Sequence, residues 1–135
     1  MVSTDTQTAS VQTQLRVGNV IGRLINTHIM ALTYEGHEIT MEDVAHSEKI
    51  RESLIAHRPF YCMVEMPNLR HTSEETRRHP PHPNTRGVAV VYASPVGRML
   101  GNAFLRLKGS MLPTRLFGTR EQALSWLEEL GPPKH

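Results

Sequence analysis

Short apolar runs alternate with amphipathic stretches along most of the chain. Residues 60–66 and 87–92 are almost entirely apolar, which predicts strands that are covered on both faces of a sheet. Residues 19–32 alternate loosely between apolar and polar side chains and predict a hairpin of two strands. A last short strand is predicted at 113–117.

Four amphipathic stretches predict helices between and after these strands. Each begins at a Ser or Thr suited to cap its N-terminus: Thr40, Thr72, Ser94 and Thr119. The third has the clearest pattern, because Pro95 suits a first turn and apolar side chains then recur at i, i+3, i+4 and i+7. The order β-β-α-β-α-β-α-β-α indicates an α/β fold with a mixed, mainly parallel sheet of about four to five strands, since parallel neighbours need crossover connections.

The length of 135 residues is typical of one domain, which we place at residues 16–131. Residues 1–15 are rich in Ser, Thr and Gln and predict a flexible N-terminal tail, and residues 132–135 form a short C-terminal tail. No apolar stretch approaches the roughly 20 residues needed to cross a bilayer, so we expect no membrane insertion. The single cysteine, Cys62, lies inside an apolar run and predicts a buried, inert thiol. A lone reduced cysteine favours a cytoplasmic location.

The net charge is only +2, but the charges are unevenly placed. Six cations and no carboxylate lie between Arg86 and Arg120, so this segment could attract an anionic ligand or the acidic half of a second copy. The alternative is an ordinary solvated surface. We expect no nucleic-acid partner, because only Tyr92 and Phe117 accompany the basic segment, too few aromatic side chains for a stacking platform.

Catalytic and cofactor motifs are missing from the sequence. There is no Gly-x-Ser-x-Gly elbow and no glycine-rich phosphate loop, so we expect neither an enzyme nor a cofactor. His71, His79 and His82 lie in or near a proline-rich stretch without a cysteine partner or a following carboxylate. A sound metal site needs ligand number and geometry together, so we predict a polar surface loop and no metal.

The start of the third helix is the candidate binding site. Its free backbone N–H groups attract anions, and polar side chains gather on the face opposite the apolar stripe. The candidate residues for binding an anion or a partner are Ser94, Gly97, Arg98, Asn102 and Arg106. The alternative is that these side chains merely solvate an exposed helix face.

Residues 93–104, 113–117 and 121–127 resemble a family of small uncharacterised bacterial proteins. Those proteins are similar to the STAS fold of anti-sigma-factor antagonists (SpoIIAA-like), which is related in shape to the CRAL-TRIO lipid-binding domain. The resemblance spans about residues 19–130. It implies a sheet with its helices mostly on one face, and self-association.

The sequence departs from the phospho-switched members of this fold, which have an Asp-Ser pair at the start of a helix after a central strand. No Asp-Ser pair occurs in this chain, and Thr72 and Ser73 occupy the corresponding position. Either hydroxyl could accept phosphate there, because a helix N-terminus favours negative charge. Capping of the helix already explains both residues.

These observations favour a non-catalytic, STAS-like protein-interaction or regulatory domain that forms a homodimer and binds an unknown protein partner. The alternative is a carrier for a lipid or another small molecule in a CRAL-TRIO-like apolar pocket. Methionine adapts to irregular apolar shapes, and five methionines could line such a pocket: Met30, Met63, Met66, Met99 and Met111.

Overall fold

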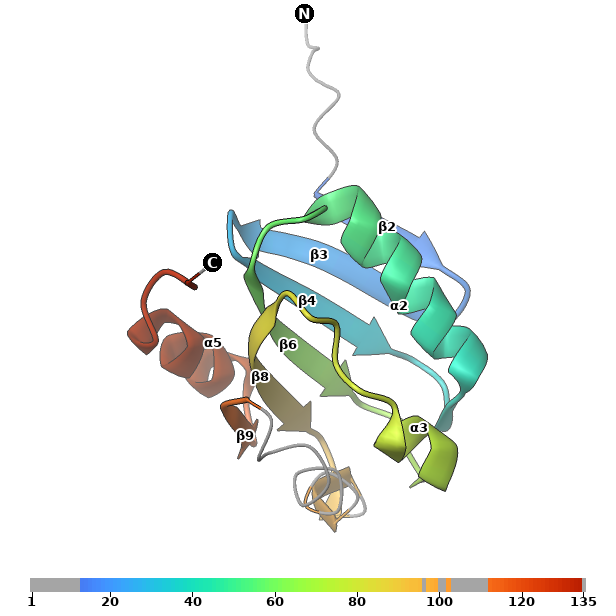
Figure 1. Ribbon diagram of the computed structural model, residues 1–135. Helices are drawn as coiled ribbons and strands as arrows, with labels where there is room; N and C mark the ends of the chain where they lie inside the picture. The colour runs from blue at the N-terminus through green and yellow to red at the C-terminus, as the bar shows by residue number, and fades with distance from the viewer. Residues whose placement is uncertain (1–12, 96, 100–101, 103–111, 135) are drawn as a thin grey trace, which may run out of the picture.

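The apolar runs of the chain form a central sheet of six strands in the order β2-β3-β4-β6-β8-β9 (Figure 1). This computed structural model describes residues 13–95, 97–99, 102 and 112–134. The strands are β2 (Gln14–Val17), β3 (Val20–Asn26), β4 (Ile29–Tyr34), β6 (Phe60–Met66), β8 (Thr85–Tyr92) and β9 (Thr114–Phe117). Strands β2, β3 and β4 pair antiparallel, whereas β4, β6, β8 and β9 pair parallel. The predicted α/β fold with a mixed, mainly parallel sheet is therefore confirmed.

The sheet has six strands rather than the four to five predicted, because β2 forms an additional antiparallel edge. This strand begins at Gln14, inside the segment predicted as tail. Its partner is β3, which it reaches through a tight turn at Gly18 with a φ of 59°. Leu15 and Val17 pack against the buried core and alternate with the exposed Gln14 and Arg16, but an alternation of four residues is too short to stand out from the polar segment before it.

Three described helices flank the sheet: α2 (Met41–Leu54), α3 (Glu74–Arg78) and α5 (Arg120–Glu129). At the start of α2, the Thr40 hydroxyl accepts from the Asp43 amide at 3.1 Å, and the Asp43 carboxylate accepts from the Thr40 amide at 3.0 Å. This reciprocal pair is a capping box, and it confirms Thr40 as the N-cap expected from the sequence. At α5 the hydroxyl of Thr119 accepts from the Gln122 amide at 3.2 Å, which confirms the expected N-cap.

The two faces of the sheet pack against different helices. In β4, Met30 and Leu32 belong to the core beneath α2, whereas Ile29 and Ala31 belong to the core beneath α5. The expectation that the helices lie mostly on one face holds for α2 and α3 but not for α5. The reason is that the apolar stripe of α5, with Ala123 and Leu127 fully buried, closes the second face.

A second, two-stranded parallel sheet joins β5 (Glu38–Ile39) to β7 (His71–Thr72) and was not predicted. Thr72 therefore lies in β7, and α3 begins one residue later than predicted. Its N-cap is Ser73, whose hydroxyl accepts from the Thr76 amide at 3.1 Å. The prediction that Thr72 caps this helix is therefore wrong. The predicted third helix is present at residues 95, 97–99 and 102, and the rest of its range lies outside the described residues.

Candidate functional site

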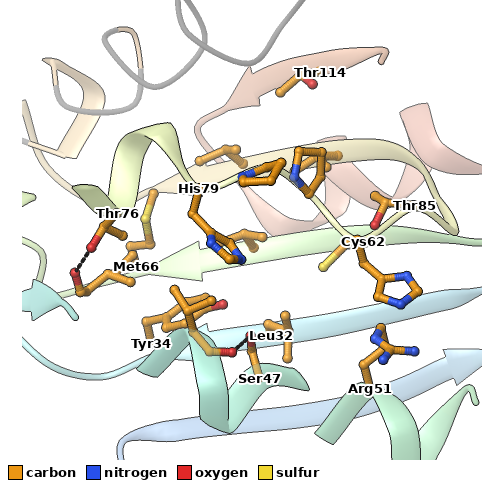
Figure 2. A pocket seen from close by; sticks show the side chains of 18 of the residues that line it. Leu32, Tyr34, Ser47, Arg51, Cys62, Met66, Thr76, His79, Thr85 and Thr114 are labelled. Atoms are coloured by element: carbon orange, nitrogen blue, oxygen red, sulfur yellow. Dashed lines mark hydrogen bonds between the residues drawn. The ribbon is translucent and has the colours of Figure 1, made fainter. Parts of the chain in front are cut away.

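A cavity of about 150 Å³ lies on the α2 side of the sheet, next to the helix (Figure 2). It exists because α2 packs mainly on β2, β3 and the edge of β4, which leaves the same face of β6 and β8 without a helix among the described residues. Other described parts of the wall come from α3, from the loop of residues 79–83, and from Leu112 and Thr114 at the start of β9. The cavity therefore joins segments that are distant in the sequence.

Most of the cavity wall is apolar. The sheet provides the floor through side chains that alternate along three parallel strands: Leu32, Phe60, Cys62, Val64, Met66, Val88 and Val90. The thiol of Cys62 is buried among them, and burial raises its pKa to about 12. The thiol thus stays protonated near neutral pH, and the buried position predicted for Cys62 is confirmed.

Neutral polar groups at the end of the cavity near α3 are already hydrogen bonded. The Ser47 hydroxyl donates to the Val44 carbonyl at 2.7 Å, and the Thr76 hydroxyl donates to the Ile39 carbonyl at 3.0 Å (Figure 2). Burial raises the pKa of Tyr34 well above its usual value, so its phenol stays neutral. The Ser47 and Thr76 hydroxyls therefore need no hydrogen bond from a ligand.

The opposite end of the cavity has a charged rim. Arg51 lines the cavity and is only 8% exposed. Its Nε donates to the Glu48 carboxylate at 3.2 Å, its Nη1 donates to the Ala56 carbonyl at 2.9 Å, and its Nη2 lies 3.2 Å from the same Glu48 oxygen. The Glu48 side chain is 42% exposed and marks the solvent side of this rim.

His82 lies at the same rim, on the loop between α3 and β8. Its Nδ1 accepts from the Asn84 amide at 3.0 Å, which places the proton of the neutral ring on Nε2. Burial, and then the charge of Arg51, lower the pKa of His82, so the ring is neutral at pH 7. The protonated ring is less favourable in the folded protein than in the unfolded chain. The contribution of His82 to the free energy of unfolding is therefore fully present above the ordinary pKa of about 6.5, and it declines as the pH falls below that value.

The predicted anion site lies elsewhere. Ser94, Arg98 and Asn102 do line a common depression with Met99 at the carboxyl end of β8. The Ser94 hydroxyl accepts from the Gly97 amide at 3.0 Å, so it serves as the helix cap. Gly97 itself is buried, and Arg106 lies outside the described residues.

The two predicted phosphoacceptors have structural partners. Arg77 donates to the hydroxyl and to the carbonyl oxygen of Thr72, both at 2.8 Å. The Ser73 hydroxyl caps α3 and also donates to the Thr76 hydroxyl at 2.9 Å. Both hydroxyls thus take part in hydrogen bonds at the start of α3.

The methionines proposed for a pocket do not gather there. Met66 lines the cavity, but Met63 is buried on the opposite face and Met99 is 63% exposed in the depression near Ser94. Met30 belongs to the core beneath α2, and Met111 lies outside the described residues.

Two of the three predicted loop histidines, His79 and His82, line the cavity. His71 instead lies 3.3 Å from the Glu38 carboxylate. In the part of the chain that the structure describes, no three His, Cys, Asp or Glu side chains are grouped to hold a metal ion. Nor does any helix there have the length and apolar character needed to cross a membrane.

The sequence of α2 gives one indication of this cavity. Glu48 and Arg51 interrupt the apolar side of α2 one turn apart, which is unexpected for a helix that packs fully against a sheet. A charged pair in that position indicates that part of the apolar side faces a space rather than the core.

A family model described as a domain of unknown function (DUF7793) matches residues 24–131. No curated protein and no solved structure matches the chain. The match covers β4 to α5 and thus every wall of the cavity.

Proposed function

This chain belongs to the DUF7793 family, and we propose that it is a non-catalytic binding domain that holds a small molecule in the cavity beside α2. The observation that supports this proposal is the cavity itself, which has an apolar floor and a polar rim. Cavities of roughly 150 Å³ lined by aliphatic and aromatic side chains bind molecules as small as benzene or xenon. Of the two kinds of carried molecule expected from the sequence, this size favours a small molecule over a lipid.

Filling the cavity should abolish binding. Val88 lines the cavity and is only partly buried, so Val88→Phe is expected to place its ring in the empty space without unfolding the protein. Benzene titrated into the wild-type protein should shift the methyl NMR signals of Val64 and Val90, and Val88→Phe should remove these shifts. Methyl-resolved NMR spectra measure both effects.

The matched control is Val91→Phe, the same substitution on the opposite face of the same strand, where Val91 packs beneath α5. This variant should retain the benzene-induced shifts. Absence of shifts in the wild-type protein, or equal shifts in Val88→Phe, would contradict the proposal.

We also propose a homodimer formed through β9, in line with the STAS-like, cytoplasmic interaction domain expected from the sequence. Among the described residues, the backbone of β9 pairs only with β8 and leaves one edge free. Next to this edge, the Arg115 guanidinium lies 5.5 Å from the ring centre of Phe117 and 5.7 Å from that of Trp126. Aromatic side chains and arginine are enriched at protein interfaces, and free sheet edges pair readily with other strands.

Light scattering at several protein concentrations tests the dimer. The wild-type chain should approach twice its monomer mass as concentration rises, and Trp126→Glu should shift this transition to higher concentration. A monomer at every concentration would refute the dimer and leave the cavity proposal untouched.

A further inference from the structure

We infer that the molecule held in this cavity is a small organic acid whose carboxylate binds at Arg51 and His82 while its apolar body lies against the sheet. The inference rests on the proposed binding function and adds the chemical class of the ligand. It follows from the charges of the wall, from the free donors at one rim and from the size of the space.

The charges of the wall favour an anion. Among the described residues, three charged side chains line the cavity, namely Arg51, Arg77 and Glu48, so the cations there exceed the anions by one. Arg77 donates to Thr72 and forms no ion pair with the other described residues. An excess of one positive charge favours a ligand that has one negative charge.

Arg51 has donors left for a ligand. Its guanidinium has five N–H groups, of which one on Nε and one on each terminal nitrogen are accounted for by Glu48 and Ala56. One N–H therefore remains on each terminal nitrogen with no partner among the described residues. Two such donors match the two oxygens of a carboxylate.

His82 adds a neutral donor at the same rim. Because Nδ1 is occupied as an acceptor from Asn84, the N–H on Nε2 is the group available to a ligand. A guanidinium and an imidazole N–H at the rim would hold the ligand's charged end near solvent. The floor formed by Cys62, Val64 and Val90 would then contact its apolar part.

The volume limits the ligand to about the size of one aromatic ring or a short aliphatic chain. Benzoate is a suitable probe, and benzamide is its neutral counterpart of nearly the same shape. In the wild-type protein we expect benzoate to bind about tenfold more tightly than benzamide, because its hydrogen bonds to Arg51 are charge-assisted. NMR titrations that follow the Val64 and Val90 methyl groups measure both dissociation constants.

The variant Arg51→Gln should weaken benzoate binding about tenfold and change benzamide binding less than about twofold. The matched control is Arg58→Gln. Arg58 donates to the carbonyls of Leu54 and Ile55 at the same helix end but does not line the cavity. This control should leave both dissociation constants unchanged.

A second variant tests the same idea through a gain of affinity, which loss of folding cannot imitate. Glu48→Gln removes the carboxylate that now shares the Arg51 donors. Benzoate should then bind more tightly, by about three- to tenfold, while benzamide should be unaffected. Because the Glu48 side chain is 42% exposed, we expect this variant to fold normally.

The outcomes separate the two proposals. If benzene binds in the cavity but benzoate binds no better than benzamide, or if Glu48→Gln does not strengthen benzoate binding, the inference of an acidic ligand is overturned and the binding function stands. If none of the three probes shifts the cavity methyl groups, the binding function itself fails.

Discussion

Gly22→Ala is expected to lower the free energy of unfolding by about 1–3 kcal/mol, because the space for a side chain at this position of β3 is already filled by α2. A Cβ atom added at Gly22 would overlap Cγ2 of Ile50 and come within 3.4 Å of Cδ1 of Leu54. Ile50 is fully buried and cannot turn away without displacing the core. Urea denaturation followed by circular dichroism measures the change.

The double variant identifies the cause. Ile50→Ala removes the overlapped methyl group and alone should cost about 2–5 kcal/mol, as is usual for a large aliphatic side chain in a core. If overlap with Ile50 is the reason, Gly22→Ala should cost about 1 kcal/mol less in the Ile50→Ala background than in the wild-type protein. Additive effects would contradict the explanation.

The control for this series is Gly118→Ala. The nearest atom to a Cβ at Gly118 is the Tyr92 hydroxyl oxygen at 3.6 Å, an ordinary contact distance. Gly118→Ala should therefore change the free energy of unfolding by less than about 0.5 kcal/mol. If Gly118→Ala lowers the free energy of unfolding as much as Gly22→Ala does, the effect comes from replacing a glycine in the backbone and not from overlap with a neighbouring side chain.

The buried strands were predictable because their physical cause is local in the sequence. Strand β6 spans Phe60–Met66, the range predicted, since a strand covered on both faces must be apolar at every position. The capping box of Thr40 and Asp43 was predictable for the same reason, because its two residues are three apart.

The missed elements depend on distant partners. Strand β2 has exposed polar side chains at Gln14 and Arg16, and only its pairing with β3 makes it a strand. β5 and β7 have two residues each, too few to show a period, and each forms only because the other lies beside it. Thr72 was assigned as a helix cap because the sequence did not show this pairing.

The cavity could not be predicted from local sequence patterns, because its walls also depend on distant partners. Its walls run from Leu32 to Thr114, and alternation along a strand shows that a side chain faces inward but not whether a neighbour fills the space before it. Val64 and Val88 are indistinguishable in the sequence from side chains in a filled core. The sequence shows that Arg51 interrupts the apolar side of α2. Only the position of the loop that contains His82 shows that a cavity lies beside this interruption.

The second large effect is expected for Leu127→Ala on α5. Leu127 is fully buried against the face of the sheet that lies opposite the cavity, where it packs with Ile29, Tyr61 and Met63. Loss of its side chain would leave a void that these neighbours cannot close, at a cost of about 2–5 kcal/mol in the free energy of unfolding. Urea denaturation measures this cost.

The matched control is Leu130→Ala, three residues later on the same helix end, because Leu130 is 36% exposed. It should cost about 1 kcal/mol or less. Because the two cores lie on opposite faces, Leu127→Ala should also leave benzene binding intact in conditions where the protein remains folded. A loss of about 1 kcal/mol or less in Leu127→Ala would show that α5 contributes little to the second core. Loss of benzene binding in folded Leu127→Ala would show that the two faces of the sheet are coupled.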